Sequence, residues 1–383
     1  MKSQIRLATV FGVELGLHYS WLIIALLITF SLAAQFHATN AAWGEGVIWT
    51  SAIVTGVLFF AGLFAHELSH ALVAKARGVP IHKITLFLLG GMAQIEGEPS
   101  NPSTEFWMGI VGPITSGVLG LLLLGVARAF GWQGSGAPAT PGLAILVWLG
   151  YINLLLGAFN MIPGFPLDGG RVLRAILWWI TGSARRSTLI AARTGQVVAV
   201  LFIGYGVFRF FAGSGIGALW TAFIGWFLLQ AAGATYLQSQ LGTLLAGQRV
   251  RDLMSTDSPF VSPDTPLDQF VHDLLRTGRR CFFVGSADRL LGLITPQDVR
   301  AIESEKWTQM RVSDAMRPVN RIHFVSPDMP ALEALETMAR EDVNQLPVTI
   351  DGRVAGVVTR AHILQSLQLR SEMAKYDAHG SAA

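Results

Sequence analysis

Two histidines four residues apart, with a glutamate directly after the first, have the clearest chemical potential in this sequence. They are His66, Glu67 and His70, in the pattern H-E-x-x-H. On an α-helix, residues four apart share a face, so both imidazoles can reach one metal ion. Zinc lowers the pKa of a bound water to about 7, and Glu67 lies where it can accept the proton. The pattern therefore predicts one zinc ion per chain that activates water.

The surroundings of this pattern favour a metal site further. H-E-x-x-H is short enough to arise by chance, but here it lies in the last third of an apolar stretch over 47–74. Ionisable groups inside a membrane helix cost several kcal/mol unless they are paired or coordinated. A helix that only had to pack in lipid would not carry three of them, so we expect His66 and His70 to bind the ion.

A catalytic zinc usually has three protein ligands, and Asp168 is the candidate for the third. It follows an apolar stretch over 143–163 and lies between two prolines and two glycines. Such residues break a helix, which allows a side chain to turn toward a neighbouring span. The alternative is that Asp168 caps a helix beginning at Gly169. We expect ligation, and capping stays open.

The composition indicates that these residues belong to a membrane protein. Of the 383 residues, 51% are hydrophobic and 14% are charged, and the mean hydropathy is +0.47; a soluble domain has about 25% charged residues. The net charge of +3 is too small to indicate nucleic-acid binding. The single cysteine, Cys281, excludes a disulfide framework and lies in an apolar run, so we expect it to be buried. Six stretches can span a bilayer: 19–36, 47–74, 105–129, 143–163, 188–211 and 217–238.

Two further elements are expected beside these spans. The segment 81–95 is too short and too rich in glycine to cross a membrane, and Ile84, Leu86 and Leu88 alternate within it, which predicts a strand or hairpin at the membrane boundary. An amphipathic helix is expected over 170–181. The fold class is therefore a polytopic α-helical membrane protein with a short β element.

The distribution of basic residues predicts the orientation. Segments 37–46, 131–142 and 213–216 contain no Lys or Arg, whereas the alternate segments are basic. Cytoplasmic loops carry the excess of Lys and Arg. Arg128 and Arg209 count mildly against the assignment. We expect a multi-pass protein of the cytoplasmic membrane, with the N-terminus and the region after residue 240 in the cytoplasm.

The last third of the chain is charged and contains an internal repeat. Three pairs of short motifs recur in the same order at offsets of 62 to 64 residues: Val250-Arg-Asp-Leu-Met with Val312-Ser-Asp-Ala-Met, Val261-Ser-Pro-Asp with Val325-Ser-Pro-Asp, and Gly292-Leu-Ile-Thr with Gly356-Val-Val-Thr. These repeats resemble CBS domains, paired cytosolic α/β modules that often bind adenosine nucleotides and commonly dimerise. The expected domains are 1–244 in the membrane, 245–308 and 309–370 as CBS repeats, and 371–383 as a flexible tail.

The resemblance to CBS domains implies a nucleotide site. In that family a Thr and an Asp in G-h-h-T-x-x-D contact phosphate and ribose. The first repeat has Thr295 and Asp298, whereas the second has Thr359 but His362 in place of the Asp. We expect Thr295, Asp298 and Thr359 to be nucleotide-binding residues. The alternative is that the pair serves only dimerisation or packing.

The membrane part resembles the site-2 protease family of intramembrane metalloproteases. The resemblance rests on His66-Glu67-x-x-His70 together with Asn160-x-x-Pro-x-x-Pro-Leu-Asp168-Gly. It implies that His66, His70 and Asp168 bind zinc, that Glu67 is the general base and that Asn160 holds the substrate backbone or the oxyanion. Gly112-Pro-Ile-Thr-Ser116 is similar to the family's G-P-x-x-N element, but Ser replaces Asn, so no polar role is carried over to position 116.

The function expected from the sequence is hydrolysis of peptide bonds in membrane-protein substrates at their transmembrane segments, in contact with lipid. One alternative is a CBS-regulated metal-ion transporter, in which intramembrane His and Asp line a metal path. Glu67 discriminates the two, because a transporter needs exchangeable ligands but no carboxylate beside the first histidine. A catalytically inactive binding scaffold is a third class, and the intact motifs argue against it.

Overall fold

The computed structural model describes residues 5–40, 42–87, 90–95, 99–136, 138–257, 259–279, 281–286 and 289–369. The chain divides into two compact units, Met1–Ser239 and Gln240–Ala383. Each unit has its own hydrophobic clusters, and each is described by itself below.

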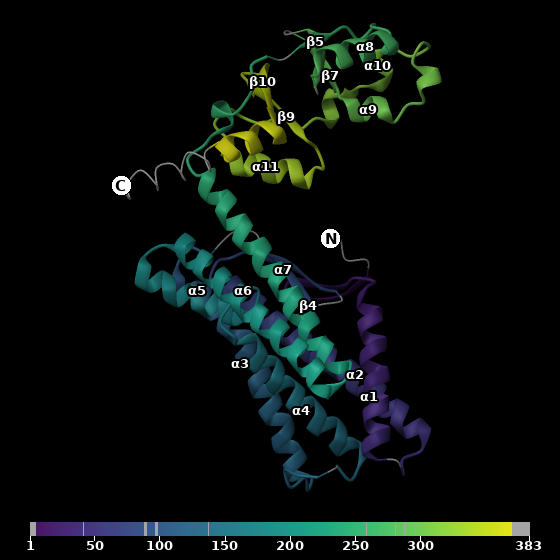
Figure 1. Cartoon of the computed structure of the whole chain (residues 1–383), viewed down its shortest axis with the longest axis vertical. Helices are drawn as coiled ribbons and strands as arrows, with labels where there is room; N and C mark the ends of the chain where they lie inside the picture. The colour runs from purple at the N-terminus through teal and green to yellow at the C-terminus, as the bar shows by residue number, and fades with distance from the viewer. Residues whose placement is uncertain are drawn as a thin grey trace. The chain divides into compact units, whose positions relative to one another are not determined.

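Six long apolar helices form most of the first unit (Figure 1). They are α1 Trp21–Thr39, α2 Glu45–Ala76, α3 Pro102–Ala129, α4 Pro141–Asn160, α6 Ala184–Arg209 and α7 Gly217–Leu244, with a short π-helical turn Phe210–Ser214 after α6. In the part of the chain that the structure describes, these six are long and apolar enough to cross a membrane. The six predicted spans are therefore confirmed. The span expected over 143–163 ends earlier, at Asn160, because turns that contain two prolines follow it.

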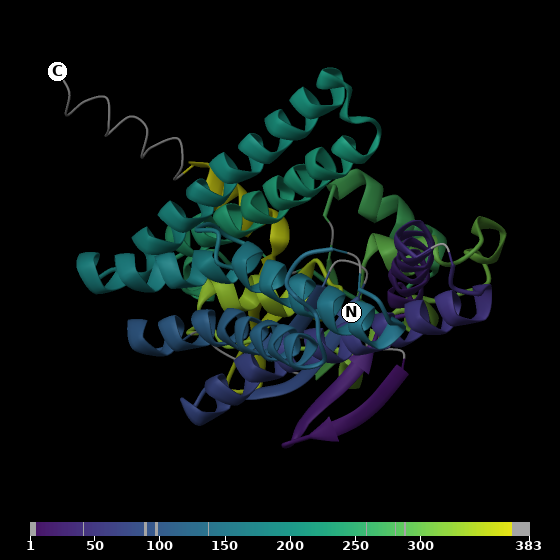
Figure 2. The same ribbon diagram turned by 90° about the horizontal axis from the view of Figure 1, so that it is seen from below.

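A four-stranded sheet lies beside these helices, with strand order β1-β2-β3-β4. Its strands are β1 Ile5–Val10, β2 Val13–Leu17, β3 Ile81–Phe87 and β4 Gly90–Ile95. The β3–β4 pair is antiparallel, which confirms the predicted hairpin, and β2 runs parallel to β3; Leu88 lies outside the described residues. The β1–β2 hairpin, drawn in purple in Figure 2, was not predicted from the sequence. The turn at Phe11 and Gly12, both with positive φ, was its local signal.

One face of the sheet packs on the helix that carries the histidines. Val13 and Ile84 are fully buried against Ala71 and Ala74 of α2 and against Met108 of α3. Ala71 directly follows His70 in the chain. The sheet therefore covers the C-terminal end of α2, and burial of these apolar side chains fixes where that end lies.

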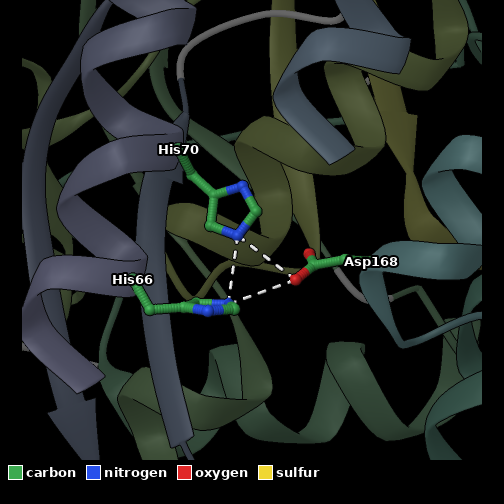
Figure 3. A group of neighbouring side chains, drawn as sticks. All are labelled: His66, His70 and Asp168. Atoms are coloured by element: carbon green, nitrogen blue, oxygen red, sulfur yellow. Dashed lines mark hydrogen bonds and ion pairs between the residues drawn. The ribbon is translucent and has the colours of Figure 1, made fainter. Parts of the chain in front are cut away.

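The helix α5 Asp168–Thr181 lies between the fourth and fifth spanning helices along the chain. Val172 and Ala175 are buried, whereas Trp179 and Ile180 are exposed. The predicted amphipathic helix is thus present, and it begins two residues earlier than expected, at Asp168. Its helical start places the side chain of Asp168 at the interface with α2, as Figure 3 shows.

The second unit contains two sheets and short helices. The first sheet has the order β5-β6-β7-β8 and the second consists of β9 and β10. The strands are β5 Phe260–Val261, β6 Phe282–Ser286, β7 Arg289–Ile294, β8 Arg317–Pro318, β9 Gln345–Ile350 and β10 Arg353–Thr359. The helices are α8 Leu267–Thr277, α9 Pro296–Arg300, α10 Val312–Ala315 and α11 Ala331–Arg340, followed by a helix over 360–369; 3₁₀ turns cover Val250–Asp252, Ser304–Lys306 and Val319–Arg321.

The two repeats exchange their first segments. Strand β8, which begins the second repeat, pairs with β7 of the first, and Ser255 near the start of the first repeat bridges to Val357 in β10. Matching ion pairs join Arg249 to Asp328 and Arg311 to Asp264. The repeats therefore complete each other's sheets and form one folding unit.

Cys281 lies in this second unit and is buried, as predicted. Burial raises the pKa of its thiol to about 12. The thiol is therefore protonated at neutral pH, which makes it a packing residue and not a nucleophile.

Candidate metal centre

Three side chains from two distant segments meet inside the first unit. His66 and His70 come from α2, and Asp168 is the first residue of α5 (Figure 3). The Nε2 atoms of the two histidines lie 3.2 Å apart, and each lies 3.2 Å from Oδ2 of Asp168. Both histidines are buried, and the Asp168 side chain is 15% exposed. The structure thus brings together the three residues that the sequence singled out as ligands.

The other ring nitrogen of each histidine contacts α3. His70 donates from Nδ1 to the backbone carbonyl of Met108, because a carbonyl can only accept. Nδ1 of His66 lies 2.9 Å from the hydroxyl of Ser116. A neutral His70 with its single proton on Nδ1 turns a lone pair on Nε2 toward the carboxylate. Two acceptor atoms that face each other at hydrogen-bond distance need a proton or a metal ion between them.

The spacing fits zinc. Ligands placed tetrahedrally at about 2.0 Å from a zinc ion lie about 3.3 Å from one another, close to the three separations of 3.2 Å. Space for an ion is also kept open by α3. A Cβ added to Gly112 would collide with Nε2 of His70 and lie 2.7 Å from Nε2 of His66. Two neutral imidazoles and a carboxylate are a donor set that zinc accepts.

Asp168 does not act as the cap of the following helix. The N-cap position of α5 is Leu167, no side-chain capping bond is made there, and the Asp168 carboxylate faces the two histidines. The preceding loop is held tightly. A Cβ on Gly195 of α6 would strike the backbone of Phe165, so only glycine allows this approach. The loop that delivers Asp168 is therefore fixed by backbone packing.

Glu67 lies beside the three ligands, half-buried in α2. It interacts electrostatically with His70, His66 and Asp168, and also with Arg171. The carboxylate is thus within electrostatic range of the candidate ion. Asn160 is placed differently. It is the last residue of α4, and its side-chain amide donates to the carbonyl of Leu156 at 3.1 Å, so its observed hydrogen bond is to its own helix.

A buried ion-pair cluster next to the centre was missed by sequence reasoning. Glu105 in the first turn of α3 is fully buried, and its Oε1 lies 3.3 Å from Nε of Arg171 and 3.4 Å from a guanidinium nitrogen of Arg174. Both arginines belong to α5, so the cluster ties the helix that begins with Asp168 to α3. The only signal in the sequence was an acidic residue at the start of an apolar span.

The expected nucleotide residues are separated in the second unit. Asp298 accepts from the backbone N–H and hydroxyl of Thr295 through Oδ2, and from Nε of Arg317 through Oδ1. A cavity of about 540 Å³ beside Thr295 is lined by Arg279, Arg300 and Asn344 among others. Thr359 lies in the other repeat, where its hydroxyl accepts from the backbone N–H of His362. Thr295 therefore lines the cavity, whereas Asp298 is engaged by its own chain.

Six long apolar helices and a buried His-His-Asp cluster in the same unit define the class as a membrane metalloenzyme. Comparison with known proteins gives the family. The family model for peptidase family M50 matches residues 54–140 and 137–202, and the CBS domain model matches residues 250–305 and 312–369. A Synechocystis sp. protein that carries the name of a zinc metalloprotease, sll0528, is 34% identical over 374 residues, which are 96% of each chain. The chain belongs to peptidase family M50, the site-2 protease family, and carries a C-terminal CBS pair.

A second relative and a solved structure are also similar to this chain. A Mycobacterium tuberculosis protein that bears the name of a zinc metalloprotease, Rip3, is 34% identical over 96% of this chain and 94% of its own. A solved structure described as a site-2 protease from Methanocaldococcus jannaschii covers 61% of this chain and 94% of its own, with 31% identity and a TM-score of 0.43. Membership of peptidase family M50 and the zinc-metalloprotease relatives identify the chain as a multi-pass zinc metalloprotease of the membrane, and they favour the protease interpretation over a metal-ion transporter.

Proposed function

We propose that this protein hydrolyses peptide bonds within or near transmembrane segments of membrane-protein substrates. The observation that carries the proposal is the buried His66-His70-Asp168 centre inside a bundle of apolar helices. A protease with its ligands among spanning helices acts on chains that reach the same depth of the membrane.

Each residue of the centre has a proposed role. His66, His70 and Asp168 hold zinc, and the bound ion supplies a Lewis acid that lowers the pKa of water. Glu67 accepts the proton of the attacking water and donates it to the leaving amine. Asn160 holds the substrate backbone or the oxyanion after its side-chain amide leaves Leu156. The clustering of Glu67 with the three ligands supports its role.

The substrate must present an extended backbone to this centre. A helix in lipid satisfies its backbone through internal hydrogen bonds, so the scissile bond is accessible only after local unwinding. Strand β4 is at the edge of the sheet and pairs with β3 on one side. Its other side can receive an unwound segment as an added strand. The sheet packs on α2, the helix that carries the histidines, and β4 itself contacts that helix.

Glu67→Gln tests the proposal. We expect the variant to bind one zinc per chain and to cleave no membrane-protein substrate, because Gln keeps the size of the side chain and loses the base. Glu45→Gln, in the first turn of the same helix, is the matched control and should cleave normally. Substantial turnover by Glu67→Gln would overturn its assigned role. Metal flux in proteoliposomes without any proteolysis would favour transport.

A nucleotide-regulated second unit is a further part of the proposal. The cavity beside Thr295 has a size typical of ligand sites, and the guanidinium groups of Arg279 and Arg300 line it. Arginine recognises phosphate well, which supports an adenosine nucleotide as the ligand. Arg317 and Thr295 already donate to Asp298, so few acceptor positions of that carboxylate are left for a ribose hydroxyl.

The orientation and the oligomeric state complete the proposal. The basic loops predict that the N-terminus and the CBS pair lie on the cytoplasmic side of the cytoplasmic membrane. A homodimer formed through the CBS pair stays a prediction. Leu275, Leu364 and Leu369 are exposed in the second unit, and they offer apolar surface to such a contact.

A further inference from the structure

We propose that one face of α3 is the second half of the metal centre and sets the orientation of both histidines. The face consists of Met108, Gly112 and Ser116, which are spaced four residues apart and so share one side of the helix. The inference rests on the proposed zinc site and deepens it, because it assigns a function to residues that do not touch the ion.

The match between the two helices carries the argument. His66 and His70 are four apart on α2, and they meet Ser116 and Met108, which lie on either side of Gly112 on α3. One imidazole therefore contacts each end of the α3 face, and both Nε2 atoms converge at its middle. A small change in the register between the helices would break both outer contacts together.

Ser116 is the side chain that contacts the other ring nitrogen of His66, the one that does not face Asp168. Its hydroxyl is 2.9 Å from Nδ1, and both side chains are almost fully buried. When Nδ1 carries the proton and donates to this hydroxyl, Nε2 presents its lone pair toward Asp168 and His70. Such an outer partner fixes the tautomer and ring orientation of a histidine ligand. Ser116 is thus a positioning residue, and the polar role absent from the sequence analysis is present in the structure.

Met108 orients His70 in the same way, but through its backbone carbonyl. Its carbonyl accepts from Nδ1 of His70. No side-chain substitution removes this acceptor, so the sequence pattern does not reveal it. The two histidines therefore have unlike outer partners, and only the partner of His66 can be deleted by mutation.

Gly112 matters because it has no side chain. Any Cβ at this position would occupy the space onto which both Nε2 atoms converge. The atoms it would meet are the ends of imidazole side chains, which can turn away without disturbing the backbone. Gly112→Ala is therefore expected to fold and to lose the metal. Gly117, on the same helix, has nothing within 4 Å of an added Cβ.

The experiment compares two variants with two controls in the purified full-length chain. Ser116→Ala is paired with Thr115→Val, since the Thr115 hydroxyl donates only to the carbonyl of Val111 on its own helix. Gly112→Ala is paired with Gly117→Ala. Zinc affinity is measured by competition with a chromophoric chelator, and the melting temperature of the zinc-free protein reports folding independently of activity.

We expect Ser116→Ala to weaken zinc binding about 10- to 100-fold, the range seen when an outer partner of a ligand is lost, and Gly112→Ala to weaken it more. Both controls should keep the wild-type affinity. The proposal is overturned if Ser116→Ala matches Thr115→Val, or if Gly112→Ala matches Gly117→Ala. A variant whose zinc-free form melts well below its control would show a structural role instead. Zinc-binding wild type that cleaves no substrate would sink the proposed function and leave this inference standing, whereas wild type without zinc would sink both.

Discussion

Two largely buried carboxylates, one in each unit, have different kinds of polar neighbours. In the second unit, Asp298 accepts only from donors: the backbone and hydroxyl of Thr295 and the guanidinium of Arg317. In the first unit, Asp168 faces the Nε2 atoms of two imidazoles. In neutral His70 this nitrogen is an acceptor, because the single ring proton is on Nδ1 and is donated to Met108. Burial and nearby charge are common to both sites. The neighbours of the carboxylate distinguish the two roles. A carboxylate surrounded by hydrogen-bond donors stabilises the fold, whereas one that faces other acceptors is suited to bind a cation.

The largest effect on zinc affinity is expected when the carboxylate of Asp168 is replaced. Asp168→Asn keeps the size of the side chain and replaces an anionic ligand with a neutral amide. We expect zinc affinity to fall by at least about a hundredfold, since loss of an outer partner alone costs about 10- to 100-fold. Proteolysis should disappear with the metal. Metal analysis of the purified protein measures the first effect, and full zinc content in this variant would remove Asp168 from the ligand set.

Glu105 offers an intermediate test, because it is a carboxylate of the first unit whose Oε1 faces two guanidinium groups. Glu105→Gln leaves Arg171 and Arg174 without their buried anion. Loss of one partner of a buried ion pair typically costs about 3–5 kcal/mol of unfolding free energy, and α5 should loosen with it. We expect a lower melting temperature and weaker zinc binding together.

Glu14→Gln is the comparison for Glu105, since Glu14 pairs with Lys83 at the sheet surface. It should change neither the melting temperature nor the zinc content. If Glu105→Gln behaved like Glu14→Gln, the cluster would have no part in placing Asp168.

The smallest effect concerns the second unit. Calorimetric titration of the full chain with ATP or AMP should show binding, and Arg300→Ala should weaken it by about tenfold, as expected for one lost charge-assisted hydrogen bond. Lys306→Ala is the control, because Lys306 is an exposed residue that pairs with Glu303. Absence of binding heat with the wild type would leave the pair with a role in packing or dimerisation alone.

The elements whose signals are local could be predicted from the sequence. The apolar spans, the i,i+4 spacing of His66 and His70 and the offsets of the internal repeat are properties of neighbouring residues. The β1–β2 hairpin was missed although its turn residues Phe11 and Gly12 carried a signal. Its strands are short, and they are stabilised by parallel pairing of β2 with β3, about seventy residues later in the chain.

The chain by itself therefore determined that a membrane protein carries two histidines on one helix face, with an aspartate after a broken span and a repeated module at its end. Tertiary structure alone decided that Asp168 turns to the histidines and not to its own helix, and that Met108, Gly112 and Ser116 surround them. It also decided that Asp298 forms an ion pair with Arg317. The physical reason is the same in each case. Whether a polar atom is satisfied depends on partners that are distant in the sequence, and only the packed fold brings those partners within hydrogen-bond distance.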